Sequence, residues 1–299
     1  MMTNQPQRLD IADPIRTNAI LHQYHFEFKK SLGQNFLTNR RVIAGILAAA
    51  QLQPDDLVIE IGPGIGSLTE QLAREVQQVI AVEIDQRLIP ILEATLAPYD
   101  NVTVVHQDIL QTDLASLVAA HAQPGYGQIK VVANLPYYIT TPIMFSLING
   151  VTQPDVLVLM MQKEVAQRII AHPGHKDYGP LSISTQLQMQ AEIDQIVPKT
   201  AFVPQPNVDS AVLRLHRYAQ PPYQIGDRQR FDQVVQASFQ QRRKNLQNNL
   251  LRLVGKDQKS ELSAVFSQLG LAGTLRAEQL TIPDFIELTA ALADFHWSK

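Results

Sequence analysis

The chain of 299 residues contains no cysteine, which excludes disulfide bonds, thiolate zinc sites and a cysteine nucleophile. Its eight histidines form neither the H-E-x-x-H pattern nor a similar ligand spacing, so we expect no metal. No apolar run approaches the roughly 20 residues that span a bilayer. Residues 1–13 are polar and lack the apolar core of a signal peptide. The sequence therefore predicts a cytoplasmic protein without a membrane segment.

A strong positive charge is also missing. The net charge is −3, and the composition of 45% apolar and 18% charged residues is that of an ordinary folded protein. Two stretches nevertheless contain basic residues and no acidic ones: Lys29, Lys30, Arg40 and Arg41 in the first, and Arg242, Arg243, Lys244 and Arg252 in the second. Such runs are commonly solvated helix faces, but they also suit local contacts with a phosphate backbone.

The pattern of apolar residues predicts a doubly wound α/β sheet. We expect strands at residues 57–61, 78–84, 102–106, 129–133, 155–161, 193–197 and 211–216. We expect helices between them at residues 67–75, 86–96, 142–149 and 163–171. The early strands are dense in Val and Ile, as in parallel strands that are buried on both faces. A Pro-rich loop too short for a helical crossover joins the last two strands, which indicates an antiparallel edge.

A second domain is predicted after a linker that contains Pro221 and Pro222. Amphipathic patterns predict helices at residues 228–239, 243–254, 258–269 and 283–296, and no strand pattern appears there. We place the boundary near residue 218. No coiled-coil heptads or spare apolar stripe occur, so we expect a monomer.

A glycine-rich turn follows the first predicted strand, in the sequence Glu60-Ile-Gly-Pro-Gly-Ile-Gly-Ser67. Glycines allow a tight turn and a close approach to a ligand. Ser67 occupies the third glycine position of the dinucleotide fingerprint, and Pro63 lacks an N–H that could bind a pyrophosphate. The turn therefore favours a ligand without phosphates over a dinucleotide.

Acidic residues end the next two strands. Glu83 lies 21 residues after Gly62, where a carboxylate can accept from both ribose hydroxyls. Asp108 ends the third strand and can accept from an adenine amino group. Each acid taken alone is more typical of a helix cap or a turn. Together with Asn134 at the end of the fourth strand, they predict one crevice with the dimensions of a nucleoside.

The fourth strand runs into Asn134-Leu135-Pro136-Tyr137. The exocyclic amine of a nucleobase is a poor nucleophile, because its lone pair is delocalised into the ring. The side-chain oxygen of Asn134 and a backbone carbonyl near Leu135 could accept its two N–H groups. Pro136 stiffens the turn, and Tyr137 offers a flat face for stacking. The alternative is a simple strand-to-loop turn, in which Asn and Pro are common.

These features in this order resemble class I S-adenosylmethionine-dependent methyltransferases that act on amino groups. Three further segments narrow the resemblance to the ribosomal RNA adenine dimethyltransferases, and among them to the bacterial small-subunit enzymes. They are residues 29–37 (KKSLGQNFL), 202–210 (FVPQPNVDS) and 239–246 (FQQRRKNL). The resemblance extends from about Arg16 to the end of the chain.

The resemblance implies a Rossmann-like catalytic domain at residues 1–217, with residues 1–30 as an N-terminal extension, and a helical RNA-binding domain at residues 218–299. It implies S-adenosylmethionine as cofactor, bound by Asn35, Leu37, Gly62, Glu83, Asp108 and Asn134.

The resemblance also implies a reaction. The methyl group would pass in line to N6 of two adjacent adenosines near the 3′ end of small-subunit ribosomal RNA. Each flipped base would lie between Tyr137 and Phe202, although a buried core phenylalanine is the alternative for Phe202. No histidine base is needed. The expected RNA contacts are Lys176, Tyr178, Arg242, Arg243 and Lys244.

Several other functions stay open. A resistance methyltransferase acting on large-subunit RNA would share the pocket. A DNA adenine methyltransferase is disfavoured, because no separate base-reading domain is evident. An assembly factor that binds immature small subunits, with methylation as a secondary role, belongs to a different class. An NAD-dependent oxidoreductase is disfavoured by Ser67 and by the Asn134–Tyr137 segment.

Overall fold

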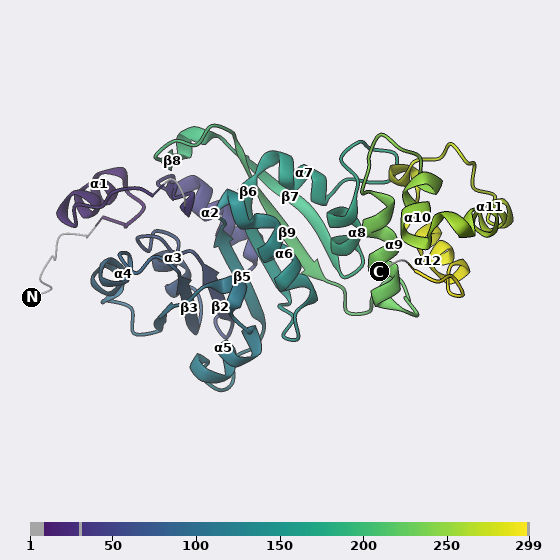
Figure 1. Ribbon diagram of the computed structural model, residues 1–299. Coiled ribbons are helices and arrows are strands. Elements are labelled where there is room, and N and C mark those ends of the chain that lie inside the picture. The colour runs from purple at the N-terminus through teal and green to yellow at the C-terminus, as the bar shows by residue number, and fades with distance from the viewer. Residues whose placement is uncertain (1–8, 30–31, 298–299) are drawn as a thin grey trace, which may run out of the picture. The chain divides into compact units, whose positions relative to one another are not determined.

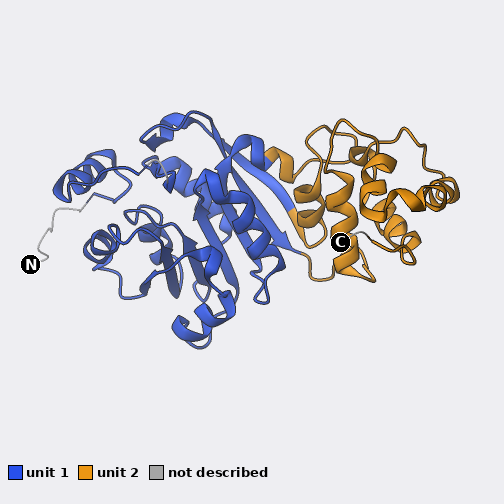
Figure 2. Ribbon diagram, in the orientation of Figure 1, with its two compact units in different colours: residues 1–166, 191–217 blue, residues 167–190, 218–299 orange. Residues whose placement is uncertain are grey.

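The computed structural model describes residues 9–29 and 32–297 (Figure 1). Residues 1–8 of the predicted extension, and Lys30 and Ser31 of the first family segment, lie outside the described residues. The chain divides into a sheet unit, residues 1–166 and 191–217, and a helical unit, residues 167–190 and 218–299 (Figure 2). The third boundary between the units, after residue 217, lies where the domain boundary was expected, near residue 218, whereas residues 167–190 group with the helical unit and not with the first domain.

The sheet unit is built on a seven-stranded sheet of order β4-β3-β2-β5-β6-β9-β7. Its strands are β2 (Leu57–Ile61), β3 (Gln78–Glu83), β4 (Val102–His106), β5 (Ile129–Asn134), β6 (Val156–Gln162), β7 (Met189–Val197) and β9 (Ser210–Arg217). The strands from β4 to β6 are parallel, and β9 runs antiparallel to β6. Every residue of β2 and β3 is buried, because both faces of the sheet are covered. The predicted doubly wound sheet with an antiparallel edge is confirmed.

Two very short strands, β1 (Phe36–Leu37) and β8 (Phe202–Val203), form a separate antiparallel pair. Leu37 is opposite Phe202, and Phe36 is opposite Val203. This pair was not predicted, since two residues give no periodic signal. It joins the first family segment to the second.

Helices of the sheet unit are α1 (Pro14–Gln23), α2 (Arg40–Ala50), α3 (Thr69–Ala73), α4 (Ile89–Leu96), α5 (Leu114–His121) and α6 (Thr140–Asn149); α7 (Lys163–Ile169) crosses into the helical unit. Sequence analysis missed α1, α2 and α5. Each has an N-cap side chain that accepts from the first turn: Asp13, Asn39 and Asp113. These caps are the signal that could have located the three helices.

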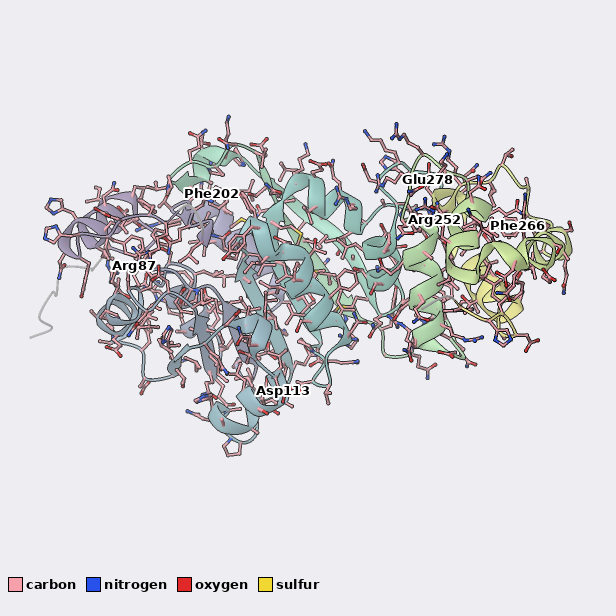
Figure 3. All side chains as sticks on the ribbon, in the orientation of Figure 1. Arg87, Asp113, Phe202, Arg252, Phe266 and Glu278 are labelled. Carbon is pink, nitrogen blue, oxygen red and sulfur yellow. The ribbon has the colours of Figure 1, made fainter. Side chains whose placement is uncertain are left out.

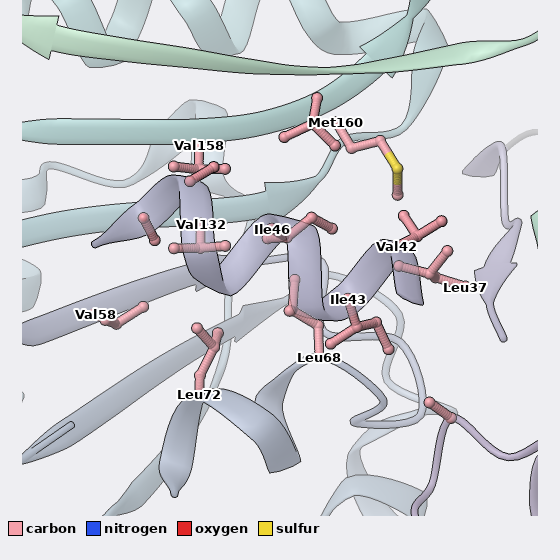
Figure 4. Close-up of a cluster of buried hydrophobic side chains, with 14 of the residues drawn as sticks. Leu37, Val42, Ile43, Ile46, Val58, Leu68, Leu72, Val132, Val158 and Met160 are labelled. Carbon is pink, nitrogen blue, oxygen red and sulfur yellow. The ribbon is translucent and has the colours of Figure 1, made fainter. Parts of the chain in front are cut away.

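A hydrophobic core lies between α2 and the central strands (Figure 4). Ile43 and Ile46 of α2 belong to one buried cluster with Val132 and Val158 of the sheet and Leu72 of α3. Burying one such aliphatic side chain contributes about 1.5–3 kcal/mol. This packing fixes the strands whose carboxyl ends carry the polar residues described below.

The helical unit has its own core, in which Phe231, Leu250 and Phe285 are fully buried. Its helices are α8 (Pro180–Gln186), α9 (Arg228–Ser238), α10 (Leu246–Val254), α11 (Lys259–Gln268) and α12 (Ile282–Ala291). The helix predicted from residue 243 begins later, because Asn245 is its N-cap and accepts from the backbone N–H of Asn248 at 2.9 Å. Within the two described ranges, no helix is both long enough and apolar enough to cross a membrane.

Candidate functional site

A cavity opens at the carboxyl ends of the parallel strands of the sheet unit. It is lined by residues 32–37, by the turn after β2, by the ends of β3 and β4, and by residues 134–139 after β5. The lining includes every residue predicted to hold a cofactor: Asn35, Leu37, Gly62, Glu83, Asp108 and Asn134. Leu135, Pro136 and Tyr137 line the same cavity. The fold thus collects residues that lie far apart in sequence at the edge where α/β sheets bind ligands.

The glycine-rich turn closes one side of this cavity. Gly62 and Gly64 have φ angles of +70° and +62°, which side chains with a Cβ rarely adopt. A Cβ on Gly64 would lie 2.9 Å from the ring of Phe36. The turn therefore needs glycine at position 64 for both its conformation and its contact with β1.

Glu83 is buried at the end of β3, beside that turn. Its carboxylate accepts from the backbone N–H of Asp85 at 2.8 Å and of Gly64 at 3.3 Å. Burial raises the pKa of Glu83 to about 7, and these two hydrogen bonds only partly oppose the rise. Glu83 is thus an acceptor that is only about half ionised near neutral pH.

Asp108 is a cap residue, which is one of the two interpretations that its position allowed. Its Oδ1 accepts from the backbone N–H of Leu110 at 3.0 Å and caps the 3₁₀ helix Ile109–Gln111. Its Oδ2 accepts from Nε2 of Gln111 at 3.1 Å. Asp108 also lines the cavity. A carboxylate has about four acceptor positions, so the cap leaves some available to a ligand.

Asn134 is held in one orientation. Its Nδ2 donates to the backbone carbonyl of Asn35 at 3.0 Å. Only the nitrogen end of an amide can donate, so this bond leaves Oδ1 as the acceptor at the cavity wall. The adjacent Leu135 is fixed through its N–H, which donates to the carbonyl of Met160 at 3.0 Å.

Tyr137 is anchored to the antiparallel edge of the sheet. Its hydroxyl lies 2.6 Å from Oγ of Ser210, a fully buried residue at the start of β9. Burial raises the pKa of the Tyr137 hydroxyl, so Tyr137 is neutral. The hydrogen bond to Ser210 holds its ring in place. Tyr138, which sequence analysis missed, also lines the cavity and lies over Gly33. Its position directly after Tyr137 is the sequence signal that could have indicated this role.

Phe202 does not line the cavity. Phe202, labelled in Figure 3, is 3% exposed and belongs to the core cluster of the sheet unit. It is paired with Leu37 through β1 and β8. Phe202 is thus a buried core residue, as the alternative interpretation expected. A role opposite Tyr137 would require this side chain to leave the core.

The expected RNA contacts all fall in the helical unit, and one of them is buried. Lys176, Arg242, Arg243 and Lys244 are exposed, and Nη1 of Arg242 donates to the carbonyl of Lys176 at 3.1 Å. Tyr178 is only 1% exposed, because its ring packs edge-on against Phe239 in the core. Its side chain cannot contact RNA in this structure, so the prediction for Tyr178 is corrected to a core role.

Two further polar residues of the cavity were not singled out from sequence. Oε2 of Glu60 and Oγ of Ser67 are buried and have no hydrogen-bond partner among the described residues. Burial raises the pKa of Glu60 to about 8. Unpaired polar atoms of this kind fit a ligand that brings its own donors. Among residues 9–29 and 32–297, no group of three or more His, Asp or Glu side chains is arranged to hold a metal ion.

Glu60→Gln should flatten the pH dependence of stability. The carboxyl pKa is raised from 4.5 to about 8. The folded protein therefore binds more protons between these values, and the free energy of unfolding falls as pH rises through this window. The fall is at most about 1.4 kcal/mol per pH unit for one group. Urea unfolding at pH 6 and pH 8.5 measures it; Glu75→Gln, at an exposed site, is the matched control. An equally steep fall in Glu60→Gln would contradict the assignment.

Comparisons with known proteins agree with one another. Residues 25–294 match the ribosomal RNA adenine dimethylase family. The ribosomal RNA small subunit methyltransferase A of Ligilactobacillus salivarius is 52% identical over 285 residues, 95% of this chain and 96% of that protein. That of Latilactobacillus sakei is 54% identical over 285 residues, with the same coverage.

Two solved structures are similar along most of the chain. A dimethyladenosine transferase from Plasmodium falciparum has a TM-score of 0.70 at 25% identity, over 86% of this chain and 97% of that chain. The 23S rRNA methyltransferase ErmE has a TM-score of 0.63 at 30% identity, over 86% of this chain and 99% of that chain.

Proposed function

The chain belongs to the ribosomal RNA adenine dimethylase family, and from this premise we propose that it transfers methyl groups from S-adenosylmethionine to N6 of two adjacent adenosines near the 3′ end of small-subunit ribosomal RNA. The product is N6,N6-dimethyladenosine, and the reaction belongs to small-subunit biogenesis. The observation that carries this proposal is the orientation of Asn134, whose Nδ2 is bound to Asn35 and whose Oδ1 remains an acceptor at the cavity wall.

The cofactor pocket is assigned to one wall of the cavity. Glu83 would accept from the ribose hydroxyls, and Asp108 from the adenine amino group. Gly62 and Asn35 would approach the cofactor through their backbone, and Leu37 would pack against it. Bound S-adenosylmethionine supplies a methyl group that is already activated on a sulfonium. The unpaired oxygens of Glu60 and Ser67 suit its donor groups.

The target amine is assigned to the opposite wall. Oδ1 of Asn134 and the carbonyl of Leu135 would accept its two N–H groups and turn the lone pair towards the methyl group. Tyr137, fixed by Ser210, would stack on the adenine ring. These residues position the reacting atoms and hold no proton themselves, since the methylated amine is acidic enough to lose its proton to water. Positioning alone can supply about 7–11 kcal/mol of a barrier.

The proposal is tested with small ribosomal subunits that lack the modification. They are incubated with the protein and radiolabelled S-adenosylmethionine, and the digested RNA is analysed for N6,N6-dimethyladenosine. We expect label in that nucleoside. Cofactor binding without label in any ribosomal RNA would contradict the proposed substrate.

A second candidate substrate has one observation in its favour, the similarity to the 23S rRNA methyltransferase ErmE. Large subunits in a parallel incubation decide between the two. If label appeared only in large-subunit RNA, the proposed substrate would change from small-subunit to large-subunit RNA.

We further propose that the protein acts as a cytoplasmic monomer on the small subunit. Sedimentation as a stable dimer at micromolar protein would contradict the monomer.

Cofactor affinity should fall with pH below about 7. Glu83 has a pKa of about 7 in the free protein, and the ribose hydroxyls bind its ionised form. Binding must therefore displace a proton at lower pH, which weakens affinity by up to about tenfold per pH unit. Isothermal titration calorimetry from about pH 6 to about pH 8, in buffers with different ionisation enthalpies, measures both affinity and released protons.

Two variants distinguish the effect of Glu83 ionisation on cofactor affinity from that of Glu60. Glu83→Gln should bind weakly with little pH dependence below pH 7. Glu60→Gln should keep the dependence below pH 7, because its own pKa lies higher, at about 8. An affinity in the unmodified protein that does not change between pH 6 and pH 7 would contradict the role of Glu83.

A further inference from the structure

One wall of the cavity in the sheet unit is made by residues 32–37, and residues 26–29 precede this wall in the chain. We call these two segments together the strap. They are joined to each other, because the backbone N–H of Lys29 donates to Oε1 of Gln34 at 2.9 Å. The strand that the strap contributes, β1, has two residues, so backbone pairing alone does not fix its position. The strap therefore depends on side chains from other elements.

Side chains hold the strap from two sides of the cavity. On the side of β5, Nδ2 of Asn134 donates to the carbonyl of Asn35 at 3.0 Å. On the side of β3, Oδ2 of Asp85 accepts from Nε2 of Gln34 at 2.7 Å. Asp85 follows Glu83 by two residues, so the second attachment lies directly after the carboxylate that ends β3.

Arg87, labelled in Figure 3, strengthens the attachment at β3. Its Nε and Nη2 donate to the two carboxylate oxygens of Asp85 at 2.9 Å and 2.6 Å, and its Nη1 donates to the carbonyl of Glu27 at 2.9 Å. Its guanidinium carbon also lies 4.8 Å from the centre of the Phe26 ring. A guanidinium can form this fork because its donors lie in one plane. Arg87 thus connects Asp85 to the strap through both a hydrogen bond and a ring contact.

The ring of Phe26 carries this attachment to the glycine-rich turn. Phe26 lies 5.7 Å from Phe36, measured between ring centres, and Phe36 is the ring that a Cβ on Gly64 would meet at 2.9 Å. The strap is therefore packed between Arg87 and the turn after β2. A change in the position of Arg87 would be passed to the cavity wall through these rings.

Asp85 is also bound to Glu83 itself. Its backbone N–H donates to Oε1 of Glu83 at 2.8 Å. Burial raises the pKa of Glu83 to about 7, and the charge of Asp85 adds to this rise. Burial opposes the ionisation of Asp85, but the hydrogen bonds from Arg87 and Gln34 outweigh it and lower the pKa of Asp85. The other titratable groups of the cavity are Glu60 of β2, Asp108 after β4, and Tyr137 and Tyr138 after β5.

From these contacts we infer that Asp85 and Arg87 are positioning residues for the cofactor, which hold the strap with Asn35 against the ribose acceptor Glu83. Neither of the two lines the cavity, so they act through the residues that do. This inference rests on the proposed function and adds to it a pair of residues outside the pocket. The alternative is an ion pair that stabilises the fold without affecting the cofactor.

Cofactor affinity of the full-length protein tests the inference. Isothermal titration calorimetry with S-adenosylmethionine is performed at about pH 8.5, where Glu83 is ionised. Arg87→Gln and Asp85→Asn should each weaken binding at least about tenfold, because each removes charge-assisted hydrogen bonds that hold the strap. The double variant should bind about as weakly as the weaker single variant, since both changes break the same attachment.

The matched controls are Arg276→Gln and Glu278→Gln, which break an ion pair of the helical unit. They should leave the affinity unchanged. Affinities of Arg87→Gln and Asp85→Asn within threefold of the unmodified protein would overturn the inference. Fully additive effects in the double variant would also overturn it.

The pH dependence of binding distinguishes positioning from a general loosening of the fold. Affinity should fall below a pH set by the pKa of Glu83, about 7 in the unmodified protein. Asp85→Asn removes a negative charge beside Glu83 and should lower this pH, whereas Arg87→Gln leaves that charge unbalanced and should raise it. General loosening would expose Glu83 and move both values down, towards the ordinary pKa of glutamate. A shift of both variants in the same direction would therefore overturn the inference.

Hydrogen exchange in the free protein observes the strap directly. The backbone amides of residues 32–37 should exchange faster in Arg87→Gln and Asp85→Asn, while the core amides of α9 and α10 should be unaffected. Unchanged exchange of the strap would overturn the inference. Failure of the unmodified protein to bind S-adenosylmethionine would instead contradict the proposed function.

Discussion

Asn134→Ala should lower kcat for N6,N6-dimethyladenosine formation by about 10²–10³-fold, the usual effect of removing one preorganised group that acts on the reacting atoms. The carbonyl of Leu135 would still accept one N–H of the target amine. The second acceptor would be absent, so the lone pair would no longer be turned towards the methyl group. Single-turnover transfer of labelled methyl groups to undermodified small subunits measures the effect.

Asn134→Asp sharpens this test, because it keeps an acceptor and removes a donor. Aspartate cannot donate to the carbonyl of Asn35, which lies 3.0 Å from Nδ2 in the present structure. We expect a loss similar to that of the alanine variant. Asn248→Ala, at an exposed site of the helical unit, should retain full activity. Activity of Asn134→Ala within fivefold of the unmodified protein would contradict the assigned role.

The arrangement of the cofactor residues was predictable because parallel strands end at the same edge. Once β2, β3, β4 and β5 were recognised, the residues after each strand had to lie near one another. Gly62, Glu83, Asp108 and Asn134 follow from this rule, and all four line one cavity. The roles of these residues stay predictions, since their positions alone do not show what they bind.

Contacts between distant segments were not predictable in the same way. Phe202 and Leu37 are paired through strands of two residues, and no local pattern indicates such a pair. Tyr178 lies in a polar loop that reads as exposed, yet its ring packs against Phe239. Sequence periodicity describes the face of one element, whereas these residues are buried by a partner from another. The grouping of residues 167–190 with the helical unit was missed for the same reason.

Lys130 is a further residue whose burial depends on partners from other elements. It is the second residue of the otherwise largely apolar strand β5, and its side chain is 2% exposed. Its Nζ lies 2.7 Å from Oδ2 of Asp56, and it donates to the carbonyl groups of Ala50 at 3.2 Å and Gln51 at 2.7 Å. A buried lysine is compatible with a folded core only with such partners. The pair and the two carbonyl groups tie β5 to the end of α2.

Lys130→Met should lower the free energy of unfolding of the sheet unit by about 3–5 kcal/mol, because it leaves the Asp56 carboxylate buried without its counter-ion. The double variant Lys130→Met/Asp56→Asn should recover most of this loss, since it removes both charges and keeps an oxygen that accepts from the backbone N–H of Gln53. Urea unfolding is followed by far-UV circular dichroism, which reports both units, and by the fluorescence of Trp297, which reports the helical unit. The transition that appears in circular dichroism and not in fluorescence is that of the sheet unit. Arg276→Met breaks an exposed pair with Glu278 and should cost less than about 1 kcal/mol. If Lys130→Met were as stable as Arg276→Met, or if the double variant were no more stable than Lys130→Met, the buried pair would not stabilise the strand that carries Asn134.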